Sequence, residues 1–550
     1  MTFDNIFQIP YYFLMRALFL YPNHEGYFRI PIGLTLIMTV AANEGHEVDL
    51  FDTTFIATGD NLDSKGREKD KLVKAIPMHE MFNKHSQEEI IDLWIKKIKD
   101  FKPDLIGVSI LEDAYKFTDV LLTAAKKNFD IPIMAGGVTP TMSPYVCIEN
   151  PNIDMIIQNE GEIPIKELCL AIQNKSSLSK VPNLMYKENG EVKKNNFVKY
   201  MKMDELPSQR LEFWNKKHFM KPYNGKMLMS GNFELSRGCM HKCHYCFNRY
   251  MQIGFDKEQV GAYRRNKSVD TIIKEVLEQH KKYNFEIINF SDDNFLGRSF
   301  SAMKEFYERW EKEVNIPYWI NTCIETLNEK NVPLLKKSNC AGIGIGMETG
   351  SEWVRRNILL KGNMTNQMYI DGFKLMAKHG IRSTCNVMIG FPGEYEEDVF
   401  DTIKVNKIIR SIDTELTSCT MSFVAPYAGT VMHNISVELG LIEINQKPGF
   451  KGLCDDISMS HPNIQNPNMT RERMIELREN FTDYITGVLP IPEKYLETDT
   501  ERKFAIGDPT KVMYEAYKLG PRSIDPKNLT PEKDRLIKSG NKSVLQVSTS

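Results

Sequence analysis

The chain has few cysteines and almost no net charge, and both features exclude classes of protein. Ten cysteines occur among 550 residues, too few and mostly too scattered for the disulfide framework of a small secreted domain. Seventy basic side chains stand against 72 acidic ones, so charge gives no reason to expect nucleic acid or an anionic membrane surface as a partner. We expect a protein of a reducing, cytoplasmic compartment.

Long apolar runs are also missing. No uncharged run approaches the ~18 residues that suggest a membrane-spanning helix, so we expect no transmembrane segment. The amino-terminal stretch 1–21 is apolar, but Asp4, Pro10 and Arg16 interrupt it and it lacks a small-residue cleavage site. A signal peptide is therefore not expected. The length predicts two or three domains, each with a sizeable core.

Residues 17–170 alternate short apolar strands with helices. The expected strands cover 17–21, 48–51, 105–110, 133–135 and 155–158, and helices over 34–44, 88–101 and 117–128 separate several of them. Continuous apolar strands separated by helices predict a doubly wound parallel sheet of the α/β class. Such a sheet binds ligands at the carboxyl ends of its strands. We assign residues 1–173 to this Rossmann-like domain.

The alternation returns after a less regular segment, 174–228, which predicts a linker with a small β segment. Strands over 233–235, 287–291, 318–322, 342–347, 384–389 and 418–424 then alternate with helices. This pattern predicts a partial (β/α)6 barrel over 229–430, with its site at the carboxyl ends of the strands. Residues 431–520 predict a mainly helical region, and the polar tail 521–550 is expected to be disordered.

Three cysteines stand together after the first strand of the expected barrel: Cys239, Cys243 and Cys246, in CxxxCxxC spacing. Cysteine thiolates are the usual ligands of iron–sulfur clusters, and a [4Fe–4S] cluster normally takes four. Three ligands on one loop therefore leave one iron open to a small molecule. A zinc knuckle is the alternative. Structural zinc sites, however, take four ligands, typically as two pairs, and only His241 or His244 is nearby as a fourth.

This spacing resembles the cluster loop of the radical S-adenosylmethionine (SAM) superfamily, in which SAM binds the open iron. Three later segments agree in order: 291–295 (SDDNF) resembles the DDxF segment, 344–351 (GIGMETGS) the GxESGS strand and 386–394 the GxPGE element. The resemblance implies that SAM contacts Tyr245, Ser291, Asp292, Glu348, Thr349, Asn386, Gly390 and Pro392. Solvated turns at Asp292 and Glu348, and an ordinary turn at 390–394, are the alternatives.

The first domain resembles the cobalamin-binding domains that precede the cluster domain in some radical SAM enzymes. Segments 31–36, 44–48, 104–109, 136–139 and 159–162 occur in the same order. The resemblance implies cobalamin contacts from Gly33, Ser109, Gly136, Gly137, Thr139, Glu160 and Gly161. The DxHxxG motif that supplies a histidine to cobalt elsewhere is missing around His24, so cobalamin would bind without a histidine from that motif. A simple turn at Gly136-Gly137 in a domain that binds nothing is the alternative.

The combined resemblance, over residues 15–440, implies a cobalamin-dependent radical SAM enzyme. Many class B members form a 5′-deoxyadenosyl radical and deliver a methyl group from cobalamin to an unactivated carbon or phosphorus of a small molecule or lipid. A cobalamin-containing oxidoreductase or cyclase and a non-catalytic iron–sulfur protein are the alternatives. The resemblance also implies an external one-electron donor such as flavodoxin or ferredoxin, and the substrate and oligomeric state stay open.

Overall fold

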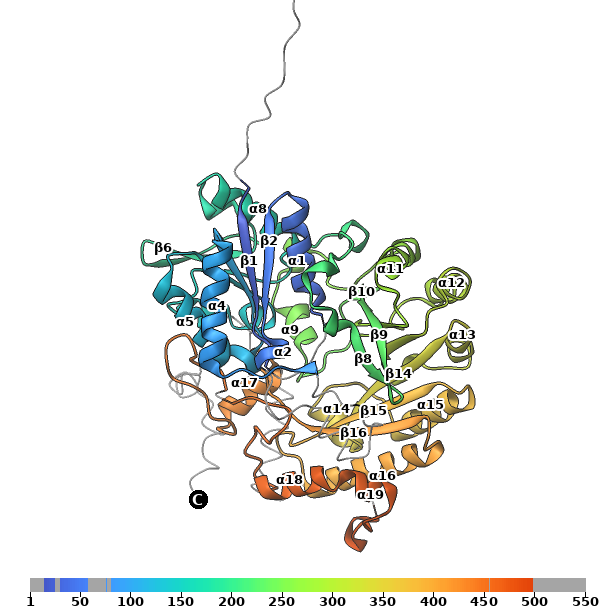
Figure 1. Ribbon diagram of the computed structural model, residues 1–550. Helices are drawn as coiled ribbons and strands as arrows, with labels where there is room; N and C mark the ends of the chain where they lie inside the picture. The colour runs from blue at the N-terminus through green and yellow to red at the C-terminus, as the bar shows by residue number, and fades with distance from the viewer. Residues whose placement is uncertain (1–13, 25–29, 58–75, 77–80, 455, 498–550) are drawn as a thin grey trace, which may run out of the picture.

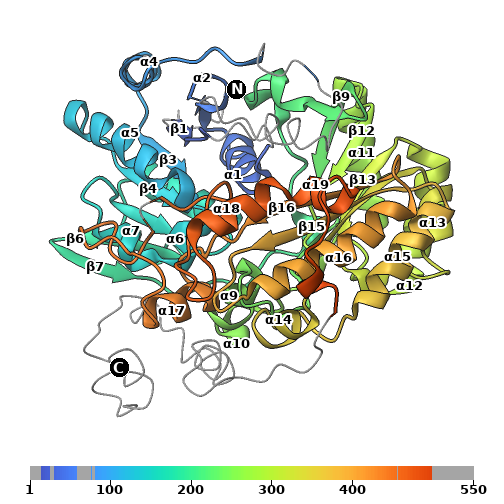
Figure 2. The ribbon, with the colours of Figure 1, turned by 90° about the horizontal axis from the view of Figure 1, so that it is seen from below.

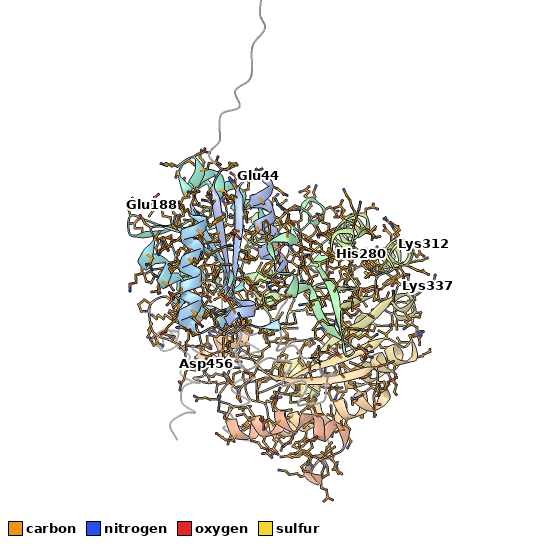
Figure 3. The ribbon with its side chains drawn as sticks, in the orientation of Figure 1. Glu44, Glu188, His280, Lys312, Lys337 and Asp456 are labelled. Atoms are coloured by element: carbon orange, nitrogen blue, oxygen red, sulfur yellow. The ribbon has the colours of Figure 1, made fainter. Side chains whose placement is uncertain are left out.

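Two seven-stranded sheets with helices packed on them make up most of the protein (Figure 1). The computed structural model describes residues 14–24, 30–57, 76, 81–454 and 456–497. Charged side chains such as Glu44, Lys312 and Lys337 are exposed and lie at the rim of the molecule (Figure 3). Among the described residues, no helix has the length and apolar character that crossing a bilayer requires.

The first sheet has the strand order β2-β1-β3-β4-β5-β6-β7. Its strands are β1 (Arg16–Tyr21), β2 (Glu47–Asp52), β3 (Leu105–Ser109), β4 (Ile133–Gly136), β5 (Met155–Ile157), β6 (Leu184–Glu188) and β7 (Glu191–Lys194). Strands β1 to β5 are parallel. Alternate residues of β1 enter different cores: Ala17 and Phe19 join one, and Leu18 and Leu20 the other. Both faces are therefore covered, which confirms the predicted doubly wound sheet.

Helices pack on both faces of this sheet (Figure 1). Helices α1 (Ile32–Asn43) and α8 (Glu162–Gln173) contribute to the core that holds Phe19. Helices α4 (Gln87–Phe101) and α5 (Tyr115–Asn128) contribute to the core that holds Leu18. The short helices α2 (Thr54–Ala57), α6 (Val138–Met142) and α7 (Pro144–Glu149) complete this part of the chain. The carboxyl ends of β1 and β3, where the strand order reverses, are thus the expected ligand edge.

Strands β6 and β7 lie within residues 174–228, which were expected to form a linker with a small β segment. They form a hairpin that pairs antiparallel with β5 and so extends the first sheet. Asn189 and Gly190 join the two strands, with φ of 53° and 80°. Positive φ at both positions is the geometry of a tight hairpin turn, which Asn-Gly favours. The turn residues were therefore a usable signal for this hairpin.

The second sheet has the order β16-β15-β14-β13-β12-β9-β8. Its strands are β8 (Met220–Tyr223), β9 (Lys226–Phe233), β12 (Ile287–Phe290), β13 (Tyr318–Thr322), β14 (Cys340–Glu348), β15 (Arg382–Ile389) and β16 (Thr417–Phe423). The six strands from β9 to β16 are parallel, and β8 pairs antiparallel with β9. This curled sheet confirms the predicted six-stranded partial barrel.

One face of the second sheet is apolar and the other is polar. The helices α11 (Val269–Tyr283), α12 (Phe300–Arg309), α13 (Val332–Lys337), α15 (Asn366–Lys378) and α16 (Glu396–Ile412) follow its strands. On β15, Cys385, Val387 and Ile389 are buried in the core with these helices, while the alternate residues Thr384 and Asn386 are only half-buried. The inner face of the barrel therefore offers amide and hydroxyl groups.

The carboxyl-terminal part joins both domains. It contains helices α17 (Val431–Glu438), α18 (Arg471–Glu479) and α19 (Phe481–Thr486). Figure 2 shows it in orange and red, with α19 beside α16. A long irregular stretch between α17 and α18 packs on the first domain, where the hydroxyl of Tyr115 donates to Gly449 O at 2.8 Å. Helices α18 and α19 meet at Asn480, and the expected tail 521–550 lies outside the described residues.

Candidate functional site at the domain interface

The three-cysteine loop lies at the carboxyl end of β9, between β10 (Ser236–Arg237) and α9 (Phe247–Ile253). Cys239 and Cys243 are buried and Cys246 is half-buried, and all three are free thiols. The donor set of three thiols on one short segment suits iron, because iron–sulfur clusters are held by thiolates. These residues therefore fit the predicted cluster.

Hydrogen bonds from α9 and from the end of β12 fix the loop. Gln252 Nε2 donates to the carbonyl oxygens of Cys239 at 2.7 Å and His241 at 2.8 Å. Asn248 Nδ2 donates to Asp293 Oδ1 at 2.8 Å, and the N–H of Gly238 donates to Asp293 Oδ2 at 2.9 Å. The loop thus holds its path through protein contacts, which is the condition for a preorganised metal site.

His244 supports the loop from behind. Its ring is 2% exposed, and Nδ1 lies 2.9 Å from the carbonyl oxygen of Ile358. Burial lowers the pKa of His244 to about 4, so its ring is neutral at physiological pH. Its backbone N–H also donates to Leu359 O at 3.0 Å. His244 therefore ties the loop to the segment after α14 (Glu352–Asn357).

Asp292 and Ser291, both predicted to contact SAM, differ in position. Asp292 is buried and accepts from the N–H of Leu235 at 3.0 Å and the hydroxyl of Ser236 at 2.5 Å. Burial raises its pKa to about 7. Ser291 lies on the inner face of the barrel, and its hydroxyl donates to Asn232 Oδ1 at 2.6 Å. Asp292 therefore holds the strand that leads into the loop, and the SAM contacts of both residues stay predictions.

Glu348 and Tyr245 are brought together although 103 positions separate them. Glu348 Oε1 accepts from the Tyr245 hydroxyl at 2.9 Å and from Lys361 Nζ at 2.8 Å. Lys361 is only 6% exposed. Burial alone would lower the pKa of Lys361, but Glu348 and the neighbouring tyrosine and cysteine side chains together outweigh burial and raise it. Lys361 is therefore charged, and Glu348 stands at the end of β14 with a strained φ of 70°.

The remaining predicted SAM residues lie at the carboxyl ends of β14 and β15. The hydroxyl of Thr349 is buried, 3.2 Å from Thr402 Oγ1. Asn386 Oδ1 accepts from the hydroxyl of Thr420 at 2.8 Å on the inner face. The N–H of Gly390 donates to Glu394 Oε2 at 2.7 Å, and Pro392 is buried in the same turn. Their position agrees with a ligand at the barrel mouth, and each contact stays a prediction.

The predicted cobalamin residues Ser109, Gly136, Gly137 and Thr139 gather at the carboxyl ends of β3 and β4. Gly137 has a φ of 100°, and a Cβ there would lie 3.2 Å from Ser109 Oγ, so only glycine fits. A Cβ on Gly136 would meet its nearest atom at 3.9 Å, and one on Gly33 would meet none within 4 Å. No neighbouring atom blocks the approach of a ligand at Gly136 or Gly33, and the cobalamin contacts of these residues stay predictions.

Glu160 connects the first domain to the cluster loop. Its carboxylate pairs with Arg265, and Oε2 lies 3.2 Å from Arg237 Nη1. Arg237 Nη1 also lies 2.8 Å from Glu162 Oε1, and its Nη2 lies 2.8 Å from Glu234 Oε1. Arg237 precedes Cys239 by two residues, so these buried ion pairs join the loop after β5 to the cluster loop.

The contact of Glu160 with cobalamin stays a prediction, because the structure places its carboxylate in this network. Neighbouring Gly161 begins α8, and a Cβ on it would lie 2.8 Å from the Ile37 side chain of α1. The absence of a side chain there lets the two helices pack closely. The segment 159–162 thus allows α1 and α8 to pack closely, a role that was not predicted from the sequence.

Lys361 was not selected from the sequence. A lysine between two helices gives no local signal, since most lysines are exposed. Its burial becomes visible only when the fold places it beside Glu348 and Tyr245. Asn248 and Gln252, which lie on α9 and support the cluster loop, were not selected from the sequence either.

Family models match both halves of the chain. The B12 binding domain matches residues 79–169, and the Radical SAM superfamily matches residues 233–405. An uncharacterised methyltransferase from Pyrococcus horikoshii is 28% identical over 353 residues, which are 63% of this chain and 72% of that protein. The anaerobic magnesium-protoporphyrin IX monomethyl ester cyclase of Synechocystis is 24% identical over 454 residues, 78% of this chain and 79% of the cyclase.

A solved structure shares the fold. The radical SAM methyltransferase TsrM from Kitasatospora setae, with cobalamin and a [4Fe–4S] cluster bound, has a TM-score of 0.57 at 16% identity, over 85% of each chain. This structural similarity supports the order of domains in this chain, a Rossmann-like domain followed by a partial barrel. The chain therefore has a B12-binding domain followed by a radical SAM domain.

Proposed function

We propose that this enzyme is a methyltransferase that modifies an unactivated carbon or phosphorus of a small molecule or lipid. The observation that carries the proposal is the network of Glu160, Arg237 and Arg265, which joins the first domain to the cluster loop. When bound, a [4Fe–4S] cluster with SAM supplies a 5′-deoxyadenosyl radical, and cobalamin carries the methyl group. TsrM, with both groups bound, and the methyltransferase relative support this assignment.

The loop residues have defined tasks in this proposal. Cys239, Cys243 and Cys246 would hold the cluster through three thiolates, which would leave one iron available to SAM. Asp293 and Gln252 keep the loop in place through the N–H of Gly238 and the carbonyl oxygens of Cys239 and His241. Because these contacts are made by protein groups, little reorganisation accompanies binding.

The barrel residues bind and orient the ligands. The charged pair of Glu348 and Lys361 offers SAM both an acceptor and a donor beside the loop. Asn289 and Asn321 lie on the inner face and are at least partly exposed there. They offer amide groups to a neutral, hydrogen-bonding part of the substrate. An external one-electron donor such as flavodoxin or ferredoxin reduces the cluster.

Similarity to the Synechocystis cyclase favours a second candidate, a radical oxidoreductase or cyclase. The products separate the two candidates. Methyl transfer through cobalamin consumes a second SAM and releases S-adenosylhomocysteine, whereas cyclisation leaves 5′-deoxyadenosine as the product of SAM. Both candidates require SAM cleavage at the cluster, which is the first step to test.

SAM cleavage is tested with the full chain, reconstituted anaerobically with iron and sulfide and given SAM and a strong reductant. We predict 5′-deoxyadenosine by mass spectrometry with the wild type and none above background with Cys243→Ala, because the loop then lacks one of its three thiolates. Cys340→Ala is the matched control, since Cys340 is buried at the opposite end of β14. Cleavage by Cys243→Ala would falsify the assignment of the cluster.

A further inference from the structure

The cluster loop is open to solvent at its tip. Of residues 239–246, all of which the structure describes, only Met240 and Lys242 are exposed. Met240 is 51% exposed, although methionine is among the side chains that are most often buried. These two residues lie between or beside Cys239 and Cys243. The tip is therefore the part of the loop where a partner in solution comes closest to the cysteines.

The rest of the loop is covered by protein. Arg237, at its start, pairs with Glu160 of the first domain. The N–H of His244 donates to Leu359 O at 3.0 Å, and its own carbonyl oxygen accepts from the N–H of Met432, on α17, at 3.0 Å. A large partner is therefore kept away from these sides of the loop.

Basic side chains surround the exposed methionine. Met240, Arg264 and Gly297 line one hollow at the surface. Arg264 is exposed, and its Nη2 donates to Gly297 O at 2.8 Å. Arg298, the next residue, is half-buried, and among the described residues its Nε and Nη1 have no hydrogen-bond partner. Together with exposed Lys242, these side chains give the tip a positive rim.

The carboxylates of the neighbouring strand ends already have partners. Asp293 accepts from the N–H of Gly238 and from Asn248, so it is held by the loop and α9. Glu325 Oε1 lies 2.6 Å from His241 Nε2. Neither carboxylate pairs with the exposed basic residues of the tip, which stay available to a partner with negative charge.

We infer that the loop tip, Met240 and Lys242 with Arg264 beside them, is the docking face for an acidic one-electron carrier protein. This inference rests on the cluster of the proposed function. One electron passes from the reduced flavin or iron–sulfur group of the carrier to the cluster, and no bond forms or breaks. The flexible methionine adapts to the carrier's surface, while the basic rim attracts its carboxylates and speeds the encounter.

Reduced flavodoxin, an acidic flavoprotein, is the probe. It is mixed anaerobically in a stopped-flow instrument with the reconstituted full chain, and the oxidation of its flavin is followed. At low ionic strength we expect Lys242→Glu/Arg264→Glu to oxidise flavodoxin at least roughly tenfold more slowly than the wild type, because reversed charges repel the carrier. Added salt should slow the wild type and narrow the difference.

Two controls separate docking from damage to the cluster. Lys312 and Lys337 are exposed and precede β13 and β14, at the strand edge opposite the loop (Figure 3). Lys312→Glu/Lys337→Glu should therefore react with flavodoxin as the wild type does. With excess dithionite, a small reductant that needs no docking face, all three proteins should form equal amounts of 5′-deoxyadenosine.

Equal flavodoxin rates in the wild type and Lys242→Glu/Arg264→Glu would overturn the inference. A matching loss with dithionite would overturn it too, because it marks these residues as supports of the loop. So would a wild type that is active with dithionite but does not oxidise flavodoxin, or one whose flavodoxin rate does not depend on salt. The last result decides even if the variant assembles no cluster. A wild type that assembles none refutes the proposed function as well.

Discussion

At the scale of single residues, the buried pair of Lys361 and Glu348 is the feature with the largest energetic consequence. Two opposite charges at 2.8 Å compensate each other's loss of hydration, while one alone would remain uncompensated. The Tyr245 hydroxyl donates to the same carboxylate oxygen and links the pair to the cluster loop. Glu348 therefore contributes to stability, and its contact with SAM is a separate prediction.

We predict that Lys361→Met lowers the free energy of unfolding by about 3–5 kcal/mol, because it leaves the Glu348 carboxylate buried without its cation. The double variant Lys361→Met/Glu348→Gln should recover much of that loss, since it removes the charge as well. Urea unfolding of the full chain measures both. Additive losses in the two single variants would contradict a direct coupling between these side chains.

The sequence predicts those site residues that belong to a motif with characteristic spacing. The three cysteines follow from CxxxCxxC, and Gly137 follows from a strand end that turns sharply. Asp292 carries the right chemistry at the right strand end, but its oxygens bind Leu235 and Ser236.

At the scale of elements, apolar periodicity predicts the strands and their parallel order well. Buried parallel strands are continuous apolar runs, which few other structures imitate. The hairpin of β6 and β7 lies in the segment predicted to be a linker with a small β segment, and the Asn189-Gly190 turn is the signal that would have given its position. The irregular stretch after α17 has no periodicity, since it is held by contacts with the first domain.

Glu112 connects the irregular stretch around α17 to the first domain through hydrogen bonds. It follows β3, and its carboxyl group accepts from the N–H of Ala428 at 2.7 Å and of Cys454 at 3.1 Å. Burial raises its pKa from 4.5 to about 7. Between these values the folded protein holds one more proton than the unfolded chain, so the free energy of unfolding falls as the pH rises.

We predict that this pH-dependent change in the free energy of unfolding, at most about 3 kcal/mol, is absent from Glu112→Gln. Glutamine is neutral at every pH. The stability of the variant should therefore fall less than that of the wild type between about pH 5 and pH 8. Urea midpoints at the two pH values measure the difference, and Glu149→Gln, at an exposed position, is the control. Identical pH slopes in wild type and Glu112→Gln would show that Glu112 ionises normally.

At the scale of the whole molecule, several contacts hold the two domains against each other. Besides the network of Glu160, Arg237 and Arg265, Asn232 Nδ2 donates to Ile30 O at 2.9 Å and Trp214 Nε1 donates to Thr35 Oγ1 at 2.9 Å. These partners lie far apart in sequence, so no local pattern predicts them. They bring the predicted cobalamin edge and the cluster loop into one assembly.

Methyl transfer needs both domains in one reaction, and product analysis with methyl-deuterated SAM tests this most directly. The full chain is reconstituted anaerobically and given a strong reductant, with and without hydroxocobalamin. The account predicts 5′-deoxyadenosine and S-adenosylhomocysteine together, the latter only with cobalamin. If 5′-deoxyadenosine appears while S-adenosylhomocysteine is absent with cobalamin present, or if S-adenosylhomocysteine forms without cobalamin, the account is contradicted.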